Sequence, residues 1–219
     1  ETVKYIGGYA FRGCGITSAD LSSTGINCVS NCLFNSCGAL EAVYLPESAV
    51  SIGYAAFSNC TSLSSVSAPL VKSVDYNAFR GCSALYDKSS FESVEFVGTG
   101  AFDGTGIYSE AGGKALTVGS ALYKTEESEI SKFIVENGIK QVSPYALYNA
   151  DSLELLVLPE TLDRIYADSI PSNESTEIYV FATADEVYED LSGLSAGTVY
   201  IPQGKQVENE NIKVGYITG

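Results

Sequence analysis

Cysteine is the residue type in this sequence most able to do chemistry, because six cysteines occur and no histidine does. Without histidine the chain has no Ser-His-Asp or Cys-His nucleophile system, no His-ligated zinc and no imidazole general base. Four of the cysteines recur at steps of 23, 23 and 22 residues: Cys14, Cys37, Cys60 and Cys82. Such regular spacing indicates a structural position that is repeated along the chain.

The regular cysteines should form one inward column of a stacked structure, with neighbouring Cα atoms about 5 Å apart. Parallel stacking does not point the sulfurs at each other, so we interpret the column as buried free thiols. Cys28 and Cys32 lie outside the column, and their spacing allows either a local disulfide or two unpaired thiols. A metal or iron–sulfur site is disfavoured there, because Cys37 belongs to the column and a fourth ligand is missing.

Two further motifs have a plain structural explanation. Gly112-Gly113-Lys114 lacks the spacing of a phosphate-binding loop. The paired carboxylates Glu126-Glu127 and Glu189-Asp190 lie in polar runs and are expected to be solvated. We therefore predict that the chain has no catalytic residues, no cofactor site and no metal site, and that it is not an enzyme.

The chain is built from a repeat, and a large apolar residue marks each copy. The marker positions are Phe11, Phe34, Phe57, Phe79 and Phe102, followed by Leu122, Leu147 and Ile170. Five residues before the marker stand Ile6, Val29, Ile52, Val74, Val97, Val142 and Ile165. A period in the twenties is typical of a leucine-rich-repeat solenoid, in which each repeat forms one coil.

The segment from Ile52 to Pro69 has the pattern I-G-x-x-A-F-x-x-C-x-x-L-x-x-V-x-A-P. It resembles the BspA-like leucine-rich repeats of bacterial surface and secreted proteins, and the resemblance covers roughly Val3 to Ile170. It implies an α/β-type leucine-rich-repeat solenoid, a right-handed stack of about eight coils of about 23 residues with short strands. Ser48 and Thr161 replace the usual Asn after the strand, so the turns should be stabilised by other hydrogen bonds.

The periodicity divides the chain into a solenoid at 1–175 and a C-terminal cap and tail at 176–219. The cap should consist of a strand at 177–181, a helix at 184–191 with Thr183 as its N-cap, and a strand at 198–202. The tail after Gln203 is polar and is expected to be loosely held. A β-hairpin insertion is expected at about 112–136, with strands near 121–124 and 133–135 around a polar turn. Each Ala-Phe pair, such as Ala56-Phe57, should lie on a short helical or 3₁₀ turn.

Composition and charge exclude several partners. The net charge of −15 disfavours nucleic acid and anionic membrane surfaces, which are bound by clustered Lys and Arg. The longest aliphatic run, Leu155 to Leu158, is far shorter than the roughly 20 residues of a membrane span. The chain begins in mid-repeat and contains no Met, so we interpret it as a trimmed or processed fragment, and we expect a monomer.

The strands should present a partner-binding face, because side chains that alternate with the core point outward. The candidate residues on this face are Ala42, Tyr44, Ser65, Ser67, Leu155, Val157, Tyr179 and Tyr200. The first four are small or polar apart from Tyr44, whereas the last four form an apolar, aromatic patch. The cap or the hairpin insertion would bury this patch if either covered it, and the sequence leaves that open.

The family resemblance implies a non-enzymatic, extracellular or cell-surface module for protein binding and adhesion. Its partner would be an extracellular protein, either of a host matrix or of another bacterial surface. A carbohydrate-binding accessory module is the first alternative, weakly favoured by outward Tyr and disfavoured by the absence of Trp. A structural spacer that presents other domains is the second.

Overall fold

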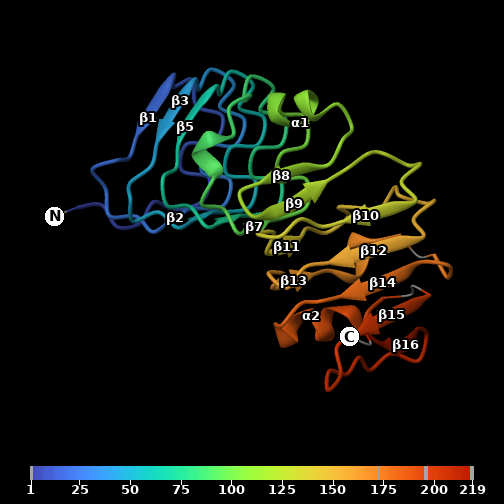
Figure 1. The fold of residues 1–219 in the computed structure, drawn as a ribbon. Coiled ribbons are helices and arrows are strands. Elements are labelled where there is room, and N and C mark those ends of the chain that lie inside the picture. The colour runs from blue at the N-terminus through green and yellow to red at the C-terminus, as the bar shows by residue number, and fades with distance from the viewer. Residues whose placement is uncertain (1, 172, 195–196, 218–219) are drawn as a thin grey trace. The chain divides into compact units, whose positions relative to one another are not determined.

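The computed structural model describes residues 2–171, 173–194 and 197–217, and its coils form a β-solenoid of about eight turns with few helices. The chain divides into two compact units, Glu1–Gly112 and Gly113–Gly219, each of which is described by itself. In Figure 1 the first unit runs from blue to green and the second from green to red. This division lies between Gly112 and Gly113.

Each regular coil of the first unit contributes one short strand to each of two parallel sheets (Figure 1). One sheet contains β1 (Ser18–Asp20), β3 (Ala42–Tyr44) and β5 (Ser65–Ser67). The other contains β2 (Cys28–Val29), β4 (Ser51–Ile52), β6 (Ser73–Val74) and β7 (Phe96–Val97). Val29, Ile52, Val74 and Val97 are in register, as the repeat predicts. Helix α1 (Gly106–Ala111) follows the last of these strands.

The Phe-containing segment of each regular coil is a series of turns, and the predicted helical or 3₁₀ conformation is wrong. Two left-handed residues flank the aromatic ring, as with Ala55 (φ 50°) and Asn59 (φ 61°) around Phe57. Every second N–H bonds the next coil and the others bond their own turn. Thus the Phe57 N–H donates to the Ala78 carbonyl at 2.8 Å, and the Ser58 N–H donates to the Ala55 carbonyl at 3.2 Å. A helix could not provide these bonds between coils, because its N–H groups are used internally.

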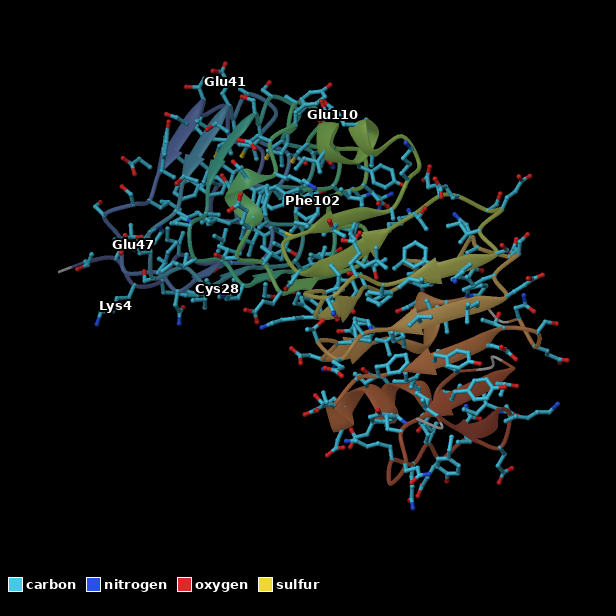
Figure 2. The ribbon with its side chains drawn as sticks, viewed as in Figure 1. Lys4, Cys28, Glu41, Glu47, Phe102 and Glu110 are labelled. Atoms are coloured by element: carbon cyan, nitrogen blue, oxygen red, sulfur yellow. The ribbon has the colours of Figure 1, made fainter. Side chains whose placement is uncertain are left out.

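A column of stacked phenylalanine rings forms the core of the first unit. Successive rings of Phe11, Phe34, Phe57, Phe79 and Phe102 lie 5.2 to 5.5 Å apart with interplanar angles of at most 17°. Phe91, from the 3₁₀ helix η1 (Ser89–Phe91), packs edge-on against two of them. Figure 2 shows Phe102 inside the coils, whereas Glu41, Glu47 and Lys4 project from the surface.

The regular cysteines link neighbouring coils through their thiols. The Sγ of Cys37, Cys60 and Cys82 donates to the carbonyl oxygen of Phe11, Phe34 and Phe57 at 2.9, 3.1 and 3.0 Å. All three are fully buried and free. Cys14, the first member of the predicted column, is free but only half-buried. The column of unpaired thiols is therefore confirmed, with full burial for three of its four members. Burial raises the pKa of the Cys37 thiol, and a hydrogen bond with Cys60 together with burial raises the pKa of Cys82.

Hydroxyl groups also connect one coil to the next, which confirms that this solenoid does not depend on an Asn ladder. Ser48 Oγ donates to the Ile26 carbonyl at 2.7 Å, and Thr161 Oγ1 donates to the Ile139 carbonyl at 3.0 Å. Thr176 Oγ1 does the same with the Leu153 carbonyl at 2.7 Å. These bonds satisfy carbonyl groups that the coil-to-coil backbone pattern leaves available.

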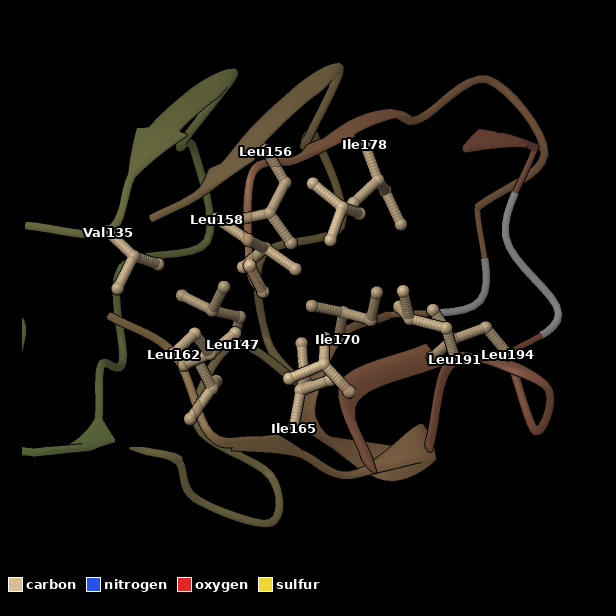
Figure 3. Close-up of a cluster of buried hydrophobic side chains, with 14 of the residues drawn as sticks. Val135, Leu147, Leu156, Leu158, Leu162, Ile165, Ile170, Ile178, Leu191 and Leu194 are labelled. Carbon is tan, nitrogen blue, oxygen red and sulfur yellow. The ribbon is translucent and has the colours of Figure 1, made fainter. Parts of the chain in front are cut away.

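The second unit contains a mixed sheet and a larger parallel sheet around one aliphatic core. The mixed sheet has the order β13 (Arg164–Ile165), β11 (Gln141–Val142), β9 (Ala121–Lys124) and β8 (Leu116–Val118). The parallel sheet has the order β10 (Lys132–Ile134), β12 (Leu155–Leu158), β14 (Glu177–Val180), β15 (Thr198–Ile201) and β16 (Lys213–Tyr216). Figure 3 shows Leu156 and Ile178 from the parallel sheet packed towards Leu147, Ile165 and Ile170. A 3₁₀ helix, η2 (Ala167–Ser169), and helix α2 (Asp185–Leu191) complete the unit.

The predicted hairpin has the wrong strands. β9 pairs antiparallel with β8, whereas β10 pairs parallel with β12. The assignment of Leu122 to the Phe column is also wrong, because Leu122 is in register with Val142 in the column five residues earlier. In that column the steps are still uneven, with 25 residues from Val97 to Leu122 and 20 from Leu122 to Val142, so the chain departs from the regular period here in either assignment.

The C-terminal strand, helix and strand are present, but they continue the solenoid. β14 and β15 extend the same parallel sheet as β12, and α2 buries Val187 and Leu191 in the same core. Helix α2 begins after Ala184, which makes no side-chain cap, so the predicted N-cap at Thr183 is wrong. The tail after Gln203 forms β16 on β15, which corrects the expectation that it is loosely held.

Candidate functional site

The strands separate buried from outward side chains by simple alternation. In β12 Leu156 and Leu158 are fully buried, whereas Leu155 and Val157 remain half-exposed. Because the parallel strands are in register, each outward position forms a row that crosses the whole sheet. The outward faces of two of the parallel strand ladders, β1-β3-β5 and β10-β12-β14-β15-β16, are the candidate binding surfaces.

An apolar row crosses the outward face of the second unit's parallel sheet. We call it the central row, and it consists of Ile134, Val157, Tyr179 and Tyr200. The two tyrosine rings stack with centroids 4.5 Å apart and an interplanar angle of 16°. Gly215 follows Tyr200 in register, and a Cβ there would lie 2.8 Å from the Tyr200 ring. The glycine thus leaves room for the ring to lie against the last strand.

A charged row runs beside the central row. It consists of Lys132, Leu155, Glu177, Thr198 and Lys213, in that order across the sheet. The Tyr200 hydroxyl donates to Glu177 Oε1 at 3.4 Å, and the Glu177 carboxylate raises the pKa of Tyr200. The face therefore has an apolar centre, a carboxylate beside it and an ammonium group on each edge strand.

The structure places all eight predicted residues on outward strand positions, in two separate faces. Leu155, Val157, Tyr179 and Tyr200 lie on the second unit's sheet, where they are half-exposed and not covered by the hairpin or by α2. Ala42, Tyr44, Ser65 and Ser67 lie on β3 and β5 of the first unit. Among these Tyr44 is 45% exposed and Ala42 is half-buried. The first-unit face is small and polar, with Tyr44 as its one large apolar group.

Ile134 belongs to the central row but was missed by the sequence prediction. Its side chain is 55% exposed, which makes it the most exposed member of the row. The prediction placed β10 in a hairpin with β9, so the pairing of Ile134 with Val157 was not anticipated. The alternation of Lys132, Phe133 and Ile134, with Phe133 partly buried against the core, is the signal that could have identified it.

Cys28 and Cys32 are both free, which resolves the alternative left open by the sequence. Cys28 is exposed and Cys32 is buried. In the part of the chain that the structure describes, no group of three or more His, Cys, Asp or Glu residues is arranged to hold a metal ion. Within the same residues no helix is long and apolar enough to cross a membrane.

Two solved structures of other bacterial proteins are similar to this chain. A leucine-rich repeat protein from Bacteroides ovatus ATCC 8483 is 16% identical with a TM-score of 0.40, covering 88% of this chain and 56% of its own. A leucine rich cell surface protein from Faecalibacterium prausnitzii A2-165 is also 16% identical, with a TM-score of 0.33, covering 90% of this chain and 51% of its own. The chain thus spans about half the length of these proteins.

A comparison with curated proteins found no match. The model of the BspA type leucine-rich repeat region matches residues 1–109 and 116–191 in six copies. The matched ranges contain the Phe stack, the Cys column and both strand ladders as far as β14. They cover well over half of the sequence, and the chain therefore belongs to the BspA-type leucine-rich-repeat family.

Proposed function

We propose that this chain is a non-enzymatic, extracellular or cell-surface module that binds another protein through the outward face of its second unit. The central row carries the proposal. It presents two stacked tyrosines, a valine and an isoleucine side by side on four rigid strands. Membership of the BspA-type family supports both the repeat-module role and the location at the cell surface.

The composition of this face matches that of a protein interface. Interfaces combine an apolar centre, in which tyrosine is enriched, with a polar rim. Here the central row spans roughly 15 Å over four strands, at about 5 Å per strand. Glu177 lies beside it, and Lys132 and Lys213 lie on the edge strands. A partner with an apolar patch flanked by acidic groups at its ends and a basic group near its middle would complement this face.

Binding to immobilised extracellular-matrix proteins and polysaccharides, measured by surface plasmon resonance, tests the proposal. Tyr179→Ala and Val157→Asp should each weaken binding to a protein ligand by about 30-fold or more. This factor corresponds to about 2 kcal/mol of binding free energy, the loss expected when a hot-spot side chain is removed. Tyr148→Ala is the matched control, because Tyr148 is 57% exposed in the same unit but lies outside the sheet. Far-UV circular dichroism verifies that each variant is folded.

Other results would replace the proposal. Loss of binding in Tyr44→Ala but not in Tyr179→Ala would move the site to the first-unit face. Binding to polysaccharides alone would indicate a carbohydrate-binding accessory module. No saturable binding by a folded chain would favour a structural spacer.

A further inference from the structure

A second candidate surface lies on the first unit and includes none of the residues of the strand faces. It is an open groove of about 550 Å³ that runs along four successive coils beside the Phe segments. Its lining includes Tyr9, Arg12, Tyr54, Ser58, Asn77 and Arg80. The volume is within the range of small-molecule sites, roughly 300 to 1,000 Å³.

The groove exists because small residues lie between larger ones at equivalent positions of neighbouring coils. Its floor contains Cys32, Ala55 and Ser58, which are 6%, 6% and 7% exposed. Tyr9 and Tyr54 rise beside the floor and are 57% and 45% exposed. The coils stack at about 5 Å, so the four coils give a track roughly 15 Å long.

Both arginines of the first unit line this groove. Among the described residues, no carboxylate lies within ion-pair distance of Arg12 or Arg80. The Arg12 guanidinium lies 5.8 Å from the centroid of the Tyr9 ring, a cation–π contact that leaves its N–H donors available. Lys72, in contrast, is paired with Glu95 at 3.0 Å. The groove therefore holds two uncompensated positive charges on an otherwise acidic chain.

Three polar side chains in the groove, those of Ser58, Asn59 and Asn77, also lack partners among the described residues. The Ser58 hydroxyl makes no hydrogen bond to any described residue, although the side chain is only 7% exposed and lines the groove. The side-chain amides of Asn59 and Asn77 likewise make no hydrogen bond within the described part of the chain. Polar groups without a protein partner at a groove surface are available to bond water or a ligand. These groups could bond the hydroxyls of a ligand.

We propose that this groove binds an acidic oligosaccharide. The guanidinium groups of Arg12 and Arg80 would donate hydrogen bonds to the carboxylates of uronic acid residues, because a planar guanidinium matches the geometry of a carboxylate. Pyranose rings would pack on the exposed faces of Tyr9 and Tyr54, and their hydroxyls would bond Ser58 and the asparagine amides. An acidic peptide would satisfy the arginines but would leave the hydroxyl-directed groups and the aromatic faces without matched partners.

This site is independent of the proposed protein-binding face, because its residues lie on the first unit and share none with the central row. Isothermal titration of the intact chain with oligogalacturonate, its methyl-esterified form and neutral dextran oligomers tests it. Only the free-acid form should bind. The variant Arg12→Gln/Arg80→Gln and the variant Tyr54→Ala should each lower its affinity about tenfold or more, as expected for loss of charged hydrogen bonds or of a stacking platform.

The matched control is Lys72→Gln/Lys88→Gln, which removes the same charge from the first unit outside the groove. It should leave the affinity for oligogalacturonate within about twofold. Equal losses in both double variants would overturn the proposal, because the effect would then be one of net charge. Absence of binding by folded wild type at millimolar ligand would overturn it too, as would equal binding of the esterified form. Tighter binding of oligoglutamate than of oligogalacturonate would overturn the proposal and indicate an acidic peptide as the ligand of the groove.

Discussion

Replacing Phe57 by Ala removes the middle ring of the phenylalanine stack in the first unit. The side chain is fully buried, and its ring lies 5.5 Å from Phe34 and 5.2 Å from Phe79. Truncating a buried Phe to Ala costs about 3 to 5 kcal/mol in lost burial and cavity formation. In a solenoid whose coils contact only their neighbours, the loss weakens two interfaces at once. We expect the free energy of unfolding of the first unit to fall by this amount.

Phe11→Ala is the matched comparison, since it deletes the same atoms from the same column. Phe11 is 37% exposed, and among the described residues it stacks on the ring of Phe34 alone. Its removal should cost about 1 to 2 kcal/mol, because part of the surface is already in water and one aromatic pair is lost. Ser58→Ala, next to Phe57 in sequence, removes a hydroxyl without a protein partner and should change stability by less than about 0.5 kcal/mol.

Thiol labelling during urea titration measures the first unit separately, because all six cysteines lie between residues 14 and 82. Cys37, Cys60 and Cys82 should react only when the first unit opens, while far-UV circular dichroism follows the whole chain. Equal shifts of the labelling midpoint in Phe57→Ala and Phe11→Ala would refute the reasoning. A cost below about 1 kcal/mol for Phe57→Ala would refute it as well.

Three further predictions follow from individual contacts. Raising the pH above 9.0, the ordinary pKa of a thiol, should lower the urea midpoint of the first unit, because the Cys82 thiol has a raised pKa in the folded state and ionises more readily in the unfolded chain. The variant Cys82→Ser should show a smaller decrease of the midpoint over the same pH range. A decrease equal to that of the wild type would contradict this account. Thr176→Val should lower the free energy of unfolding in urea by about 1 to 2 kcal/mol, because the buried Thr176 hydroxyl donates to the Leu153 carbonyl at 2.7 Å. An unchanged urea midpoint would show that this hydrogen bond does not stabilise the fold. Gly98→Ala should lower the thermal midpoint by an amount equivalent to about 1 to 3 kcal/mol, because the new Cβ would lie 2.7 Å from the Tyr76 backbone nitrogen. An unchanged thermal midpoint would show that the two coils can separate at this position.

The local features that a repeat reproduces could be predicted from the sequence. Phe57, Cys60 and Leu63 each recur at the same offset in neighbouring coils, and equivalent residues of stacked coils must contact one another. The outward residues of the strands followed from alternation, which depends only on strand geometry. This is why Val157 and Tyr179 could be placed on a surface before any contact was known.

Features that depend on which segments pair could not be predicted in this way. Leu122 was misassigned because the chain between Gly112 and Gly138 departs from the period, and only the pairing with Val142 shows its true column. The left-handed conformation of Asn59 has a sequence signal, because Gly13, Gly81 and Gly104 stand at the equivalent position of other coils, whereas that of Ala55 is not indicated by its own residue type. Coil-to-coil hydrogen bonds hold them there, at a local cost that the sequence does not reveal.

The sequence by itself determined the solenoid, its family, its column of free thiols and the outward residues of its strands, because these repeat with a period that each coil must satisfy. Only the tertiary structure decided the hairpin partner of β9, the inclusion of Ile134 in the central row and the groove that contains Arg12 and Arg80. Those two arginines are far apart in the sequence and belong to no shared motif. They line one groove because stacking brings the same edge of four coils together.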